Sequence, residues 1–133
     1  MFYRGVIFEK IMRKRFFKDW NFTGYATDGL QGLNIHNYPI IDFYKTVGNK
    51  LKVASMKTTK TKDVASWMST NAKHLKELNA LTDDKTIGTL TGKAEPYLYI
   101  FVPKGTDITD WATKINKNYT SINVVMKTIE ESL

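Results

Sequence analysis

Residues 39–58 place a carboxylate, a hydroxyl and an ammonium group at spacings that suit joint chemistry on a β-hairpin. Gly48-Asn49 is a two-residue hairpin signal, and β-branched and aromatic residues flank it. With these residues as the loop, Asp42 lies opposite Ser55, and directly opposed side chains share one face of a sheet. Lys57 is two residues beyond Ser55 and therefore lies on the same face. A register slip of one residue would send Asp42 and Ser55 to opposite faces.

These residue types suit metal-assisted cleavage of a phosphodiester. The carboxylates of Asp42 and Glu9 are hard oxygen ligands, so Mg²⁺ is the expected ion, with Mn²⁺ or Zn²⁺ as alternatives. Lys57 would help to deprotonate a water or stabilise the charge on an attacked phosphate. Ser55 and Thr58 would hold the water or a metal-bound oxygen through hydrogen bonds. The competing interpretation is an ordinary hairpin with an Asp42–Lys57 cross-strand pair.

The chain before the hairpin is predicted to contribute a helix and a packed loop. Small and apolar residues recur on one face of residues 3–18, which predicts a helix. Glu9 lies in or beside this stripe, where a carboxylate is costly without a partner. The alternative is that Glu9 sits at the rim and pairs with Arg13. Residues 19–38 are rich in Gly and Asn and are predicted to form a packed loop, with a short strand near residues 33–35.

The chain after the hairpin alternates between helices and strands. Asp63 or Thr61 caps a predicted helix over residues 63–81, whose inner stripe is Val64, Trp67, Met68, Asn71, Leu75 and Leu78. Residues 82–93 are a turn-rich connection, and residues 96–102 are a central buried strand. Thr106 or Asp107 caps a second predicted helix, and residues 122–126 form a further strand. This order predicts an α/β fold with a mixed central sheet flanked by helices on both faces, its late strands joined by a right-handed crossover.

Length and composition predict a single domain over residues 1–133 that can bury a core, since 42% of the residues are hydrophobic. The absence of Cys excludes disulfides, zinc–thiolate sites and cysteine nucleophiles. No signal peptide and no run of about 18 apolar residues is present, so we expect no membrane insertion by this domain.

A net charge of +7 predicts a polyanionic partner, either nucleic acid or an acidic protein. Nucleic acid is favoured because the excess charge is spread along the chain. The expected basic surface comprises Lys45, Lys50, Lys52, Lys60 and Lys62. We place Lys50 and Lys52 on opposite faces of their strand, and assign nucleic-acid binding to Lys45, Lys60 and Lys62.

The sequence resembles the PD-(D/E)xK nuclease superfamily. The resemblance covers roughly residues 4–102 and is carried by Arg4-Gly5-x-x-Phe8-Glu9, Ile41-Asp42-Phe43 and Ala54-Ser55-Met56-Lys57-Thr58. More narrowly, these segments are similar to the C-terminal toxin domains of bacterial contact-dependent growth inhibition (CdiA-type) effectors. Ser55 stands where the superfamily has an acidic residue, which removes a charged metal ligand.

The resemblance implies a restriction-endonuclease-like core in which Glu9, Asp42 and Lys57 are the catalytic acid, metal ligand and catalytic lysine. It implies an endonuclease toxin that is delivered as the C-terminal part of a large effector and acts in the target bacterial cytoplasm. A tRNA substrate is favoured over DNA, and a cognate immunity protein, acidic in character, would cover the active site.

Two further hypotheses stay open on the sequence. One is a non-catalytic basic module that binds nucleic acid or an acidic protein. The other is a metal-independent ribonuclease with His36 or His74 as general base, although both histidines also suit structural roles.

Overall fold

The structure is a computed structural model that describes residues 17–22 and 41–128. It contains strands β1 (Asn21–Phe22), β2 (Phe43–Val47), β3 (Lys50–Thr58), β4 (Asp84–Ile87), β5 (Leu90–Val102) and β6 (Asn123–Thr128). Its helices are α2 (Val64–Thr70), α3 (Ala72–Asn79) and α4 (Trp111–Asn118). The predicted mixed α/β class is confirmed.

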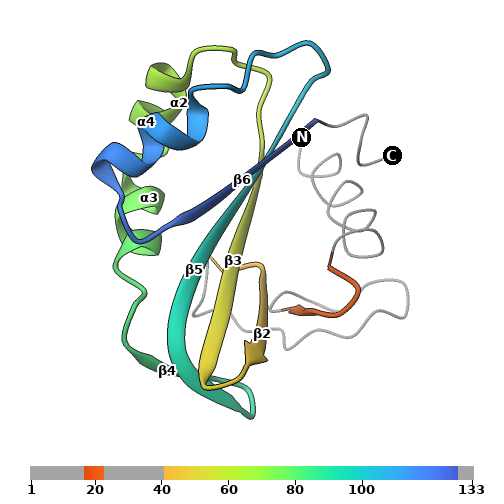
Figure 1. The fold of residues 1–133 in the computed structure, drawn as a ribbon, viewed down its shortest axis with the longest axis vertical. Coiled ribbons are helices and arrows are strands. Elements are labelled where there is room, and N and C mark those ends of the chain that lie inside the picture. The colour runs from red at the N-terminus through yellow and green to blue at the C-terminus, as the bar shows by residue number, and fades with distance from the viewer. Residues whose placement is uncertain (1–16, 23–40, 129–133) are drawn as a thin grey trace.

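The strands form one curled mixed sheet in the order β1-β2-β3-β5-β4, and β6 also pairs with β5 (Figure 1). β3 runs parallel to β5, and β5 runs parallel to β6, whereas the remaining pairs are antiparallel. The expected central strand is therefore β5, which continues further toward the N-terminus than the sequence predicts. The strand predicted at residues 122–126 is confirmed as β6.

The predicted hairpin register is confirmed. β2 pairs with β3 from Val47 opposite Lys50 to Phe43 opposite Ala54. Gly48, the first residue of the turn, has a φ of 63°, a conformation that glycine adopts without steric cost. This register decides which side chains of β2 and β3 lie on each face of the sheet.

The helix predicted over residues 63–81 is two helices. Asp63 caps α2 as expected, since its Oδ1 accepts the N–H of Ala65 at 3.1 Å. α2 ends at Asn71, whose backbone N–H and side-chain Nδ2 both donate to the carbonyl of Trp67. An asparagine side chain that bonds to nearby backbone competes with a continuous helical ladder, which accounts for the interruption.

Residues 82–93, predicted to be a turn-rich connection, instead form β4 and the start of β5. The two strands make a hairpin in which Ile87 pairs with Leu90, and Gly88 has a φ of 61°. Gly92 lies beside the turn of the β2–β3 hairpin, next to the backbone of Asn49 and Lys50. A Cβ there would lie 2.9 Å from the carbonyl oxygen of Asn49, so a glycine is required. The prediction failed because this strand is short and mostly polar.

The described helices pack on a single face of the sheet, where they lie together on the left of Figure 1. Their core contains the predicted inner residues Val64, Trp67, Leu75 and Leu78, with Trp111 and Ile115 of α4. The expectation of helices on both faces depends on the helix at residues 3–18. Most of that range lies outside the described residues, while Phe17 and Lys18 are not helical.

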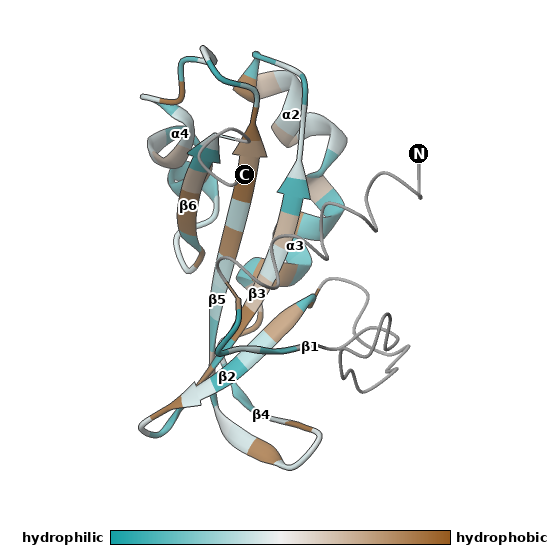
Figure 2. Cartoon of the chain, turned by 90° about the vertical axis from the view of Figure 1, so that its right-hand side faces the viewer, coloured by the Kyte–Doolittle hydropathy of each residue, from teal (hydrophilic) through white to brown (hydrophobic). Residues whose placement is uncertain are grey.

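Phe17 anchors a second, smaller core on the opposite face of the sheet. Its ring stacks on Phe43 at a centroid distance of 3.9 Å and contacts Tyr99 edge-on. The apolar residues of β5 concentrate toward its C-terminal end, where they serve both cores (Figure 2). α4 begins at Trp111, later than predicted, because Asp107 Oδ1 accepts the N–H of Thr109 in a preceding turn.

Candidate functional site

Asp42 lies where β2 stops pairing with β3. Its backbone N–H donates to the carbonyl of Ala54 at 2.8 Å, and the strand ladder begins at the next residue. Its side chain continues the pairing, because Oδ2 accepts the N–H of Met56 at 2.8 Å. The carboxylate is therefore fixed against the edge of β3, beside the strand that carries Ser55 and Lys57.

Burial raises the pKa of Asp42 from 3.8 to about 6. The hydrogen bond from Met56 and the positive charge of Lys57 both lower this pKa, but burial outweighs them. The group therefore exchanges its proton close to neutral pH. A carboxyl group of this kind is suited to accept or donate a proton during catalysis.

Lys57 is held by a histidine from the helical layer. Its Nζ lies 2.8 Å from Nδ1 of His74 on α3. Burial lowers the pKa of Lys57, and the negative charge of Asp42 opposes this change. Lys57 lowers the pKa of Asp42, and Asp42 raises the pKa of Lys57, so each group favours the charged form of the other.

The pKa of His74 is lowered by burial and then by the positive charge of Lys57, so its ring is neutral at pH 7. An ammonium group only donates hydrogen bonds, so Nδ1 accepts from Lys57 and the neutral ring carries its hydrogen on Nε2. The sequence suits His74 either to a structural role or to that of a general base, and it does not predict the contact with Lys57. The sequence signal that could have indicated this contact is the position of His74 next to the inner stripe of its helix.

Ser55 lies on the helical side of β3 with Lys57, as predicted. Leu51 and Val53 belong to the core under the helices. Because side chains alternate along a strand, Ser55 and Lys57 lie on the same face of β3 as these two residues. Ser55 is only 3% exposed, next to Leu98 of the parallel neighbour β5. Burial restricts its access to a substrate, whereas Thr58 at the end of β3 is exposed.

A pocket of about 340 Å³ opens beside Lys57 between the end of β3 and α2. The indole of Trp67 forms part of its wall, and the remaining lining is polar. The polar residues are Thr58, Thr59, Thr61, Ser66, Thr70 and Asn71. This pocket combines a cation with hydroxyl and amide groups, and two of the predicted catalytic residues, Lys57 and Thr58, line it.

The predicted basic surface is divided between two places. Lys60 and Lys62 are exposed on the segment between β3 and α2, beside the pocket residues Thr59 and Thr61. Lys45 lies on the opposite face of the sheet, with its Nζ 4.7 Å from the centre of the Trp20 ring. Lys60 and Lys62 can therefore approach a molecule in the pocket, whereas Lys45 is on the other side of the sheet.

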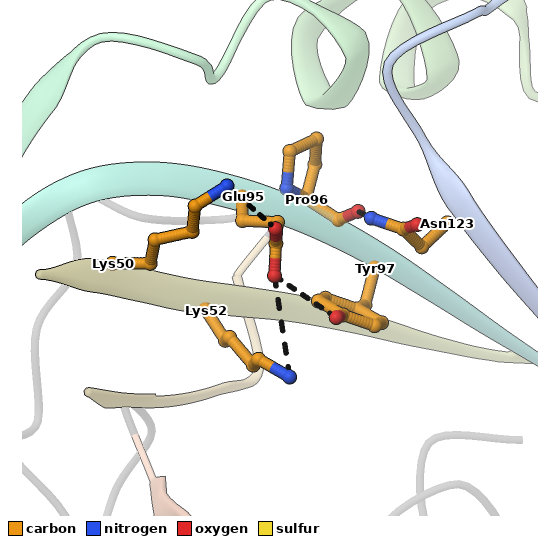
Figure 3. A network of polar contacts seen from close by, with 6 residues as sticks. All are labelled: Lys50, Lys52, Glu95, Pro96, Tyr97 and Asn123. Carbon is orange, nitrogen blue, oxygen red and sulfur yellow. Dashed lines mark hydrogen bonds and ion pairs between the residues drawn. The ribbon is translucent and has the colours of Figure 1, made fainter. Parts of the chain in front are cut away.

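The placement of Lys50 and Lys52 on opposite faces is wrong. Residues two apart on a strand share a face, and both ammonium groups contact Glu95, at 3.3 and 4.0 Å (Figure 3). Tyr97 also donates its hydroxyl hydrogen to Glu95 at 2.9 Å. This network and Lys45 form a basic and aromatic surface away from Asp42.

The expected metal site is only partly within the described residues. Asp42 lies there, but Glu9, its predicted partner ligand, lies outside them, as does His36. Over residues 17–22 and 41–128, no group of three or more His, Cys, Asp or Glu side chains is placed to hold a metal ion. Oxygen-ligated divalent ions need several ligands, so Asp42 alone does not make a metal site.

Comparison with protein-family models, with curated proteins and with solved structures found no match to this chain. No helix in the described residues is both long and apolar enough to span a membrane.

Proposed function

We propose that this chain is a nuclease toxin domain with a restriction-endonuclease-like core that cleaves phosphodiester bonds in target-cell nucleic acid. A tRNA substrate is favoured over DNA, because the Arg4–Glu9 opening resembles that of tRNA-cleaving toxins. The proposal includes delivery as part of a larger effector, action in the target cytoplasm, and neutralisation by an acidic immunity protein.

One observation supports this proposal above the others. The Lys57 ammonium group is bonded to His74, interacts electrostatically with Asp42 and borders an open polar pocket. Cleavage of a phosphodiester needs a fixed cation where negative charge develops and a nearby group that exchanges a proton near neutral pH. These requirements are met by side chains from a hairpin and a helix that are distant in sequence.

The roles follow from the surroundings of each group. Lys57 would stabilise the negative charge on the attacked phosphate, since its position is fixed before substrate binds. Asp42, ionised above about pH 6, would take the proton of the attacking hydroxyl or water. Mg²⁺, if held by Asp42 with Glu9, would polarise a phosphate oxygen.

The Lys57–His74 hydrogen bond also favours a second candidate, a metal-independent ribonuclease. In this mechanism the 2′-hydroxyl of the substrate attacks the adjacent phosphorus, the bond from phosphorus to the 5′-oxygen of the next nucleotide breaks, and that oxygen leaves with a proton taken from water. His74 is not well placed as the base through Nδ1, because Lys57 occupies that nitrogen. Its Nε2–H would instead donate to an oxygen of the substrate, and Asp42 would act as the base.

Incubation of the purified chain with total tRNA and with duplex DNA, followed by gel electrophoresis, tests the proposed function. We expect tRNA fragments, with DNA cut more slowly or left intact. Loss of cleavage in a chelator and its recovery with Mg²⁺ would support the metal-assisted mechanism, whereas unchanged cleavage would support the metal-independent one. If the folded chain cuts neither polymer with Mg²⁺, Mn²⁺ or Zn²⁺, the nuclease proposal is rejected in favour of a non-catalytic binding module.

A further inference from the structure

We propose that the pocket beside Lys57 binds one ribonucleotide unit of the substrate, with the sugar against the hydroxyl-lined wall and a phosphate toward Lys57. The inference rests on the proposed nuclease function and specifies what the site recognises. The pocket comprises Lys57 and Trp67 with the polar residues named above.

The size of the pocket suits a single nucleotide. Sites for small molecules usually measure roughly 300–1,000 Å³, and this pocket, at about 340 Å³, is at the lower end of that range. Such a volume exceeds what a lone phosphate needs and is too small for a stacked duplex. A single-stranded segment or loop that offers an unstacked nucleotide fits this description, as sequence-specific RNA sites commonly do.

The hydroxyl groups that line the pocket can form hydrogen bonds with the 2′-hydroxyl of a ribose. Ser66 and Thr70 are four residues apart on α2, so they lie on the same helix face, and both border the pocket. A hydroxyl both donates and accepts hydrogen bonds. The ribose 2′-hydroxyl has the same dual character, whereas deoxyribose lacks this group. The wall can therefore distinguish RNA from DNA.

The charge distribution places the phosphate at one end. Lys57 supplies the cation in the wall, and its hydrogen bond to His74 fixes the ammonium group. The described lining residues include no Asp or Glu, so no carboxylate there repels an anion. Lys60 and Lys62 are exposed on the adjoining segment and can contact the neighbouring phosphates of a longer strand.

The test is titration of the ¹⁵N-labelled chain with uridine 3′-monophosphate and with its 2′-deoxy counterpart, followed by NMR. We expect shift changes at the pocket residues and about three- to tenfold tighter binding of the ribonucleotide, the value of one hydrogen bond. Ser66→Ala with Thr70→Val should abolish this preference. Ser69→Ala with Thr113→Val is the matched control, because both residues are exposed and neither borders the pocket.

Cleavage kinetics separate this inference from the proposed function. In the Ser66→Ala, Thr70→Val variant, the KM for RNA should rise about tenfold with kcat nearly unchanged, as expected for loss of uniform binding. Normal RNA cleavage by this variant, or equal affinity for the two nucleotides, would overturn the inference and leave the nuclease proposal standing. Ribonucleotide-selective binding by a chain that cleaves nothing would overturn the nuclease proposal instead. A thermal melt confirms that each variant is folded.

Discussion

The ammonium nitrogen of Lys57 and Nδ1 of His74 lie 2.8 Å apart and join the end of β3 to α3. Lys57 would otherwise be a long, flexible side chain beside an open pocket. The histidine reduces that freedom and directs the ammonium group, while Asp42 supplies a compensating negative charge. This contact makes His74 a positioning residue in the proposed mechanism and leads to the first prediction.

His74→Leu should lower kcat for RNA cleavage by about 10- to 100-fold, because a misplaced cation loses part of its stabilisation of the transition state. His74→Asn should recover most of the rate, since its amide oxygen can accept from Lys57 near the position of Nδ1. Circular dichroism checks the fold of both variants. Equal rates in the leucine and asparagine variants would show that the hydrogen bond does not matter.

Asp42→Ala and Lys57→Ala should each reduce cleavage by roughly 10²–10³-fold or more, because each removes a group that acts directly on the reacting phosphate or its nucleophile. Asp83→Ala and Lys76→Ala are matched controls, since both residues are exposed on the same chain. Single-turnover assays on folded variants give the comparison. A rate within about tenfold of wild type for either site variant would show that the site is misassigned.

Asp42→Asn should stabilise the fold at pH 8 while removing activity. Burial raises the pKa of Asp42 to about 6 in the folded protein, so the folded state holds this proton more tightly than the unfolded chain. The resulting stabilisation is present below about pH 3.8 and is lost as pH rises through 6. Keeping Asp42 ionised in the folded protein above pH 6 then costs on the order of 3 kcal/mol.

Urea unfolding of wild type and Asp42→Asn at pH 5 and pH 8 measures this effect. The variant should gain most over wild type at pH 8, and the gain should shrink at pH 5. A difference that is independent of pH would mean that Asp42 does not titrate near 6. In the same range, the cleavage rate of wild type should rise with pH as Asp42 loses its proton.

Lys60→Glu with Lys62→Glu should weaken RNA binding and flatten its dependence on salt. Each lost phosphate contact reduces the log–log slope by about 0.9 on duplex or 0.7 on single strands. The double variant should be titrated across salt in an Asp42→Ala background, which prevents cleavage. Lys114→Glu with Lys117→Glu, on α4, is the control with the same change in charge.

The corresponding test of the other face is Lys45→Glu, which changes the surface that Lys45 forms with Trp20. If Lys45→Glu weakens binding more than the double variant does, the nucleic acid lies on the basic and aromatic face and not at the pocket. An affinity that does not depend on salt would support the protein-binding module.

The sequence by itself determined the hairpin, its register and the placement of Ser55 and Lys57 on one face of β3. These are local features, because a glycine turn and the alternation of a strand fix which side chains share a face. The sequence also predicted the inner stripe of Val64, Trp67, Leu75 and Leu78, because apolar residues at helical spacing indicate the buried face of a helix.

Only the tertiary structure decided that His74 meets Lys57 and that a polar pocket opens beside them. These contacts depend on where α2 and α3 lie on the sheet, which is set by packing of the whole core and not by any local spacing. The raised pKa of Asp42 has the same origin, because burial is a property of the assembled protein. A sequence pattern can predict that polar groups share one face of a strand. The helices that pack over that face determine which side chains those groups contact and how deeply they are buried.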